Sequence, residues 1–135
     1  MTTEQLWSKF EQKFQDAVSL SGAIATLSWD RETMLPSQAA QGRAQQLEYL
    51  EKHFHELITE PDYVATLHAL HSRVPDLTEV QARAVRHQFR KVQRSVRVPS
   101  ELVARKSAVT SQAYAAWNRA RSENDFSLFS NDLKS

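Results

Sequence analysis

The scarcity of glycine and proline is the feature that most constrains how this chain can fold. Its 135 residues include two glycines, four prolines and no cysteine. Between the prolines, Ala, Gln, Glu, Arg and Leu recur, and these residues favour helix. Long helices are therefore expected, and no stretch shows the period-two alternation that is typical of strands. A chain of this length can bury about two-thirds of its unfolded surface, so a real core is possible.

The four prolines divide the chain into five segments with apolar residues at helical spacing. A first helix is expected over residues 4–32, and Pro36 ends it because the residue before a proline disfavours α geometry. The other helices should begin or end beside the remaining prolines. These are Pro61, Pro75 and Pro99. The predicted fold is all-α, an antiparallel bundle of about five helices plus a short C-terminal helical turn, in a single domain over residues 1–135.

Local signals mark individual helix ends. Capping boxes pair a threonine with a glutamine three residues later, at Thr2 with Gln5 and at Thr78 with Gln81. The second helix should begin at Pro36 or Ser37, and Pro99 suits the first turn of the fifth. Asn124 or Asp125 should cap the last helical turn.

Apolar residues at helical spacing define the faces expected to be buried. On the first helix they are Leu6, Phe10, Phe14, Ala17, Ile24 and Leu27. On the fifth helix they are Leu102, Val109, Ala113, Ala116, Trp117 and Ala120. Trp7 and Trp29 should anchor the two ends of the first helix, and Gly22 should let another helix approach closely.

The fourth helix should be strongly amphipathic. Its apolar side carries Val85, Phe89, Val92 and Val96, and its opposite side carries Arg83, Arg86, Arg90, Arg94 and Arg97. The part of the chain that contains this helix is also the basic part. Residues 1–62 carry 5 Lys/Arg against 10 Asp/Glu, whereas residues 63–135 carry 12 Lys/Arg against 6 Asp/Glu. Nucleic-acid binders interleave aromatic residues or base-reading polar residues among their arginines, and this helix does not. We expect a solvated or acid-paired face.

Histidines offer no complete metal site in the sequence. His68 and His71 fall on one side of a short helix, but zinc needs at least a third ligand. His53 and His55 fall on different faces, so ordinary surface or edge positions are expected. The metalloprotease word His-Glu-x-x-His is absent.

Acid–base and nucleophilic groups are equally incomplete. Asp30 and Glu32 lie two residues apart, so they do not face each other on a helix, and ion pairing and capping are their expected roles. Ser107 and Ser111 lack a recognisable base partner. No catalytic, cofactor-binding or metal-binding residue is therefore predicted in this chain.

Several words, in order along the chain, resemble the thermostable carboxypeptidase Taq family of metallocarboxypeptidases. The first and most distinctive is LSWDRETMLP at residues 27–36. The others are GRAQQL (42–47), VPSELV (98–103), TSQAYAAW (110–117) and NDFSLF (124–129). Several words in the expected order are more specific than a single one. Together they make the resemblance cover nearly the whole chain.

The resemblance implies an almost wholly helical, much longer enzyme that removes single residues from peptide C-termini, commonly as a homodimer. It implies zinc or cobalt held by His-Glu-x-x-His and a downstream glutamate. None of these motifs can be placed on this chain, which therefore resembles the N-terminal helical portion only and should have no peptidase activity of its own. The expected partner is the missing C-terminal catalytic portion, with peptide substrate bound only by the full-length enzyme.

Such a portion should expose apolar surface that the missing part would cover. The first suspects are Phe126, Leu128, Phe129 and Leu133. Two alternatives remain, a free-standing helical interaction module and, less favoured, a nucleic-acid-binding bundle. The absence of cysteine, of a signal peptide and of an apolar run of about 18 residues predicts a cytoplasmic protein without a membrane partner.

Overall fold

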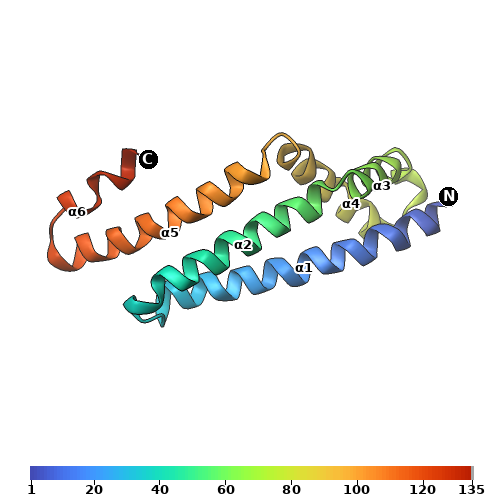
Figure 1. Cartoon of the computed structure of the whole chain (residues 1–135). Coiled ribbons are helices and arrows are strands. Elements are labelled where there is room, and N and C mark those ends of the chain that lie inside the picture. The colour runs from blue at the N-terminus through green and yellow to red at the C-terminus, as the bar shows by residue number, and fades with distance from the viewer. Residues whose placement is uncertain (135) are drawn as a thin grey trace. The chain divides into compact units, whose positions relative to one another are not determined.

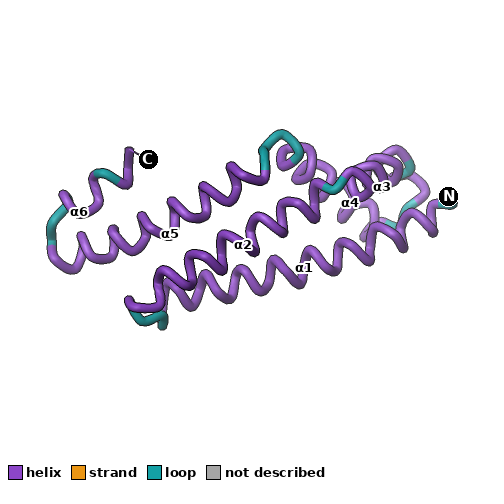
Figure 2. The backbone as a smooth tube through the Cα atoms, viewed as in Figure 1, coloured by secondary structure: helices purple, strands orange, loops and turns teal. Residues whose placement is uncertain are grey.

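The computed structural model describes residues 1–134, and every regular element in them is a helix (Figures 1 and 2). The predicted all-α fold is confirmed. The α-helices are α1 (Thr3–Thr33), α2 (Ala40–Thr59), α3 (Pro61–Ser72), α4 (Glu79–Ser95), α5 (Ser100–Glu123) and α6 (Ser127–Ser130). Short 3₁₀ helices lie at η1 (Ser37–Ala39), η2 (Val74–Asp76) and η3 (Asp132–Lys134). Within residues 1–134, no helix has both the length and the apolar composition needed to cross a membrane.

Both predicted capping boxes are present. The Thr2 N–H donates to Gln5 Oε1 at 2.8 Å, and the Gln5 N–H donates to Thr2 Oγ1 at 3.2 Å. Thr78 and Gln81 exchange the equivalent bonds at 3.1 and 3.4 Å and begin α4. Because each box satisfies two N–H groups that the helix leaves unpaired, these positions fix where α1 and α4 start.

The end of α5 shows how Asn124 and Asp125 divide the predicted capping role. Asn124 has a φ of 56°, and the Asp125 N–H donates to the Ala120 carbonyl at 2.9 Å, which is a left-handed helix ending. Asp125 Oδ1 accepts the Ser127 hydroxyl at 2.6 Å and the Ser127 N–H at 2.9 Å. The bond from the Ser127 hydroxyl contributes most, and that from the Ser127 N–H next, to holding the pKa of the Asp125 carboxyl below its usual value. Asn124 therefore ends α5, and the Asp125 carboxylate binds Ser127, the first residue of α6, although the N-cap position itself is Phe126.

The chain forms two compact units, and each is described by itself. Unit 1 comprises Met1–Ser21 and His53–Pro99. Unit 2 comprises Gly22–Lys52 and the described residues from Ser100 onwards. Both α1 and α2 therefore contribute residues to each unit.

Unit 1 holds most of the buried apolar side chains. Phe10 of α1 is fully buried, and its ring lies 5.7 Å from Tyr63 of α3 and 5.4 Å from Phe14. The predicted apolar face of α4 is confirmed at Val85 and Val92. The other buried members of this core are Leu6, Ala17, Ile58, Leu67 and Leu70. On the outside, Lys9 and Asp62 pair at 2.6 Å, and Lys13 pairs with Glu60.

The arginine stripe of α4 is exposed, as predicted. Within the described residues, one ion pair forms on this stripe and joins Arg83 to Glu79 at 3.4 Å, so the face is solvated more than acid-paired. Val96, expected on the apolar side, is 51% exposed because α4 ends at Ser95.

Four other expectations are wrong. Trp29 is 63% exposed and does not anchor the end of α1. A side chain at Gly22 would have open space around it, so no helix within residues 1–134 approaches closely there. On α5, Leu102 is 53% and Trp117 38% exposed, whereas Ser107 and Ser111 are buried. At Ser111 the apolar spacing misled because a serine hydroxyl can be buried once it is hydrogen-bonded, here to Arg31. Pro99 lies just before α5 instead of inside its first turn.

Candidate functional site

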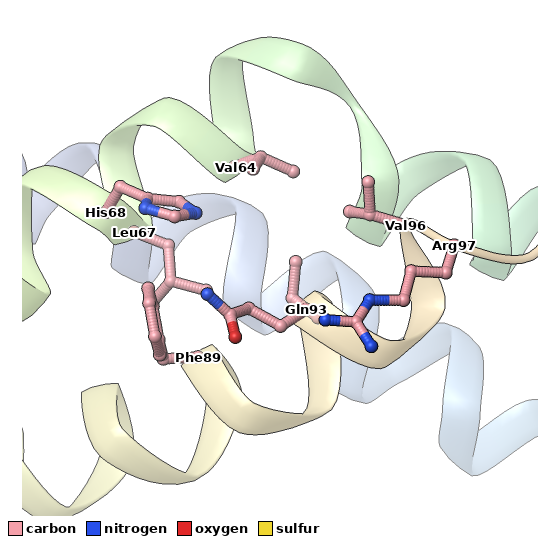
Figure 3. A pocket seen from close by; sticks show the side chains of 8 residues that line it. Val64, Leu67, His68, Phe89, Gln93, Val96 and Arg97 are labelled. Carbon is pink, nitrogen blue, oxygen red and sulfur yellow. The ribbon is translucent and has the colours of Figure 1, made fainter.

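A small cavity of about 230 Å³ lies between α3 and α4 in unit 1. Figure 3 shows His68 and Phe89 at one end, Arg97 at the other and Gln93 between them. The ring of Phe89 is in contact with two histidines, His68 at 4.8 Å edge-on and His71 at 3.8 Å stacked. The predicted histidine pair is therefore part of an aromatic cluster. Among residues 1–134, no three His, Asp or Glu side chains gather as a metal ion requires.

His55 is not the surface histidine that the sequence suggested. Its side chain is 7% exposed, and its Nε2 lies 2.6 Å from the Val98 carbonyl oxygen. Because a carbonyl oxygen only accepts, Nε2 carries the hydrogen and donates it. The bond joins α2 to the start of the VPSELV word within unit 1.

In unit 2, the end of α1 and the start of α2 form a hairpin (Figure 1). The Arg43 side chain closes this hairpin through two hydrogen bonds. One Arg43 Nη1 donates to the Leu27 carbonyl at 2.9 Å and to Asp30 Oδ2 at 2.8 Å. The Arg43 side chain is 14% exposed and that of Asp30 is 35% exposed. A charge-assisted bond of this length in a half-buried place is strong, so the pair fixes the hairpin. The predicted ion-pairing role of Asp30 is confirmed.

Arg31 follows Asp30 of the Arg43–Asp30 pair in the sequence, and its side chain reaches α5. Its Nη1 donates to Ser111 Oγ at 3.1 Å, and its guanidinium carbon lies 5.1 Å from the centre of the Tyr114 ring. Tyr114 in turn donates its hydroxyl to the Glu32 carbonyl at 3.5 Å. The Glu32 carboxylate is 3.5 Å from Arg31 Nη2, so Glu32 also forms the ion pair expected of it, though a long one.

A cavity of about 590 Å³ opens beside Arg31. It is lined by Arg31, Leu35, Pro36, Ser37, Ala40, Ser111, Tyr114, Ala115, Asn118, Arg119 and Ser122. These lining residues include two guanidinium groups, three serine hydroxyls and no carboxylate. Ser111 accepts a bond from an arginine instead of giving its proton to a base, so the arrangement suits binding and not nucleophilic catalysis.

Three of the distinctive words meet at this place. Asp30 and Arg31 come from LSWDRETMLP, Arg43 from GRAQQL, and Ser111 and Tyr114 from TSQAYAAW. Reasoning from single residues missed the two arginines and the tyrosine. The signal that could have found them is their presence in those words.

Comparison with known proteins supports the family resemblance that these words carry. Residues 9–135 match the family model described as "Carboxypeptidase Taq (M32) metallopeptidase". The chain is 26% identical over 125 residues to "Carboxypeptidase 1" of Bacillus subtilis, covering 90% of this chain and 25% of that protein. It is 26% identical over 136 residues to "Thermostable carboxypeptidase 1" of Thermus thermophilus, covering 99% and 27%.

Solved structures agree. A structure described as "BsuCP Crystal Structure" superposes with a TM-score of 0.89 at 25% identity, over 96% of this chain and 26% of that one. "Trypanosoma Cruzi Metallocarboxypeptidase 1" superposes with a TM-score of 0.73 at 27% identity, over 98% and 26%. The resemblance read from the sequence is confirmed, and the chain spans about a quarter of the length of its curated relatives.

Proposed function

Because the chain belongs to the carboxypeptidase Taq (M32) metallopeptidase family, we propose that it forms the N-terminal, non-catalytic helical portion of a metal-dependent carboxypeptidase. The complete protein would release C-terminal amino acids from peptides. The observation that carries this proposal is the coverage: nearly all of this chain matches about a quarter of each relative. In this proposal the catalytic groups belong to further polypeptide.

The residues present do not fit a catalytic metal. Among residues 1–134, no three candidate ligands gather, and His68 and His71 lie against Phe89. Zinc or cobalt, the peptide substrate and a homodimeric arrangement belong to the proposal for the complete protein.

Exposed apolar side chains in unit 2 support a role as a packing surface. Phe126 is 66% and Leu133 62% exposed, while Leu128 and Phe129, also expected to be exposed, are half-buried. Trp29 is 63% exposed in the same unit. Large apolar side chains in water favour association, so we propose that further polypeptide of the family packs on them.

The first experiment assays the purified 135-residue chain on a peptide with a free C-terminus, with zinc or cobalt added. No release of amino acid above the buffer rate is expected. Release that a chelator abolishes would refute the assignment of the chain as non-catalytic.

The second experiment replaces the matched quarter of the Bacillus subtilis carboxypeptidase with this chain. The chimera should keep metal-dependent release of C-terminal residues, and a matched control lacking that quarter should lose it. A chimera that folds, by circular dichroism and sedimentation, but has no activity would contradict the scaffold role. So would a truncated control that keeps full activity.

A further inference from the structure

The two arginines of the unit 2 site differ in how their charges are balanced. Arg43 holds the Asp30 carboxylate at 2.8 Å and a backbone carbonyl at 2.9 Å. Arg31 has a neutral hydroxyl at 3.1 Å and the Glu32 carboxylate only at 3.5 Å, beyond the 2.7–2.9 Å that is typical of charge-assisted bonds. Its side chain is nevertheless 16% exposed. Arg31 is therefore a largely buried charge that, among the described residues of unit 2, has only the loosely held Glu32 carboxylate as a counter-ion.

The guanidinium of Arg31 has donors to spare. It carries five N–H groups, and the described bonds occupy one at Ser111 and, loosely, one at Glu32. Its Nε is buried with no partner among the described residues. Each terminal nitrogen carries two N–H groups and uses at most one of them in these bonds, so one on each remains for a ligand. Tyr114 lies against the guanidinium at 5.1 Å and Ser111 holds Nη1, so the group is fixed in orientation before any ligand binds.

The cavity beside Arg31 has the size and lining of a small-molecule site. Its volume of about 590 Å³ lies within the range of ligand pockets, which are mostly apolar with a few placed polar groups. The apolar wall consists of Leu35, Pro36, Ala40 and Ala115. The polar lining adds the side chains of Ser37, Asn118 and Ser122.

We propose that this cavity binds a small organic carboxylate, with its two oxygens on the terminal nitrogens of Arg31 and its apolar tail along Leu35 and Pro36. A guanidinium fork matches the two oxygens of a carboxylate. Phosphate sites commonly add a second free charge or converging backbone N–H groups. Here the second cation, Arg119, is already paired with Glu123 at 2.9 Å, and that bond raises the pKa of Arg119. One available positive charge suits a singly charged ligand.

Glu32 is the group that competes with such a ligand. Its side chain is 53% exposed, and its carboxylate stands 3.5 Å from Arg31 Nη2, where it would repel an incoming anion. Removing its charge while keeping its shape should therefore strengthen binding. This makes Glu32→Gln a variant that gains affinity, which a merely damaged protein would not do.

The test titrates N-acetyl-leucine into the 135-residue chain and follows the Arg and Tyr signals by NMR. N-acetyl-leucinamide, which has the same tail and no charge, is titrated in parallel. The carboxylate should bind saturably in the millimolar range, and the amide at least about tenfold more weakly. Arg31→Met should weaken carboxylate binding by about tenfold or more, and Glu32→Gln should strengthen it about threefold. Arg121→Met is the matched control, since Arg121 lies over Trp117 at 5.1 Å and does not line the cavity.

Several outcomes would overturn the site. They are an absence of saturable binding to the folded chain, equal binding of the acid and the amide, unchanged affinity in Arg31→Met, or weaker binding in Glu32→Gln. Tighter binding of inorganic phosphate than of the carboxylate would overturn the ligand class. If Arg31→Met does not fold, Arg31→Lys keeps the charge without the fork, and the comparison of acid with amide on the unaltered chain still decides. The site does not depend on the proposed peptidase role.

Discussion

The hydroxyl of Tyr63 gives the sharpest prediction about stability. This side chain is 2% exposed in the unit 1 core, and its ring stacks on Phe10 at 5.7 Å. Its hydroxyl oxygen has no hydrogen-bond partner among the described residues, and burial raises the pKa of Tyr63 to about 12. Tyr63→Phe removes the hydroxyl and leaves the stacked ring in place. The substitution should therefore increase the free energy of unfolding.

The magnitude follows from the cost of burying an unpaired hydroxyl. That cost is roughly 1–3 kcal/mol in proteins, and the small void left by one oxygen offsets part of it. We expect Tyr63→Phe to stabilise the chain by about 1 kcal/mol in urea unfolding followed by circular dichroism at pH 7. The matched control is Tyr114→Phe, whose hydroxyl makes only a long bond of 3.5 Å, and its effect should stay within about 0.5 kcal/mol.

The pH dependence of the same variant checks the cause. Below pH 10 the phenol is protonated in the folded and the unfolded chain, so its contribution does not vary. Between pH 10 and about 12 the unfolded phenol ionises and the folded one does not, so stability falls as the pH rises, by roughly 2–3 kcal/mol in all. The advantage of Tyr63→Phe over the parent should grow across this window. A variant that is less stable at pH 7, or an advantage that is constant from pH 9 to 12, would refute the reasoning.

Three further substitutions test local features of the fold. Thr78→Ala removes one half of a capping box and should cost about 1 kcal/mol in urea unfolding, whereas Thr78→Ser should cost much less. Asn124→Ala places a Cβ without a compensating polar group at a φ of 56° and should lower the melting temperature, whereas Asn124→Gly should preserve or raise it. Arg43→Met leaves the Asp30 carboxylate half-buried and unpaired, so it should cost about 1–3 kcal/mol, and adding Asp30→Asn should restore part of that loss, as a double-mutant cycle would show.

Helix positions could be predicted from the sequence because the signals are local. A threonine–glutamine box or a proline acts within four residues, so the starts of α1 and α4 follow from the chain alone. The apolar face of α4 was also predictable, since its valines and arginines separate cleanly around the helix. α5 lacks such separation. Its apolar positions are mostly alanine, and the buried hydroxyl of Ser111 finds its hydrogen-bond partner in Arg31, 80 residues away.

The candidate site depends on pairings between distant residues, and no periodicity encodes those. In the sequence, Arg31 stands between two acidic residues, Asp30 and Glu32, whereas the acidic residue nearest to Arg43 is Glu48. In the fold, Arg43 meets Asp30 across the hairpin, whereas Arg31 points to the serine and tyrosine of α5. The same residue type therefore closes the hairpin at one position and leaves an available charge at the other. If the two roles are distinct, Arg43→Met should lower stability more than it changes carboxylate affinity, and Arg31→Met should do the reverse. Equal effects of both substitutions on both measurements would mean that the site is a single structural cluster.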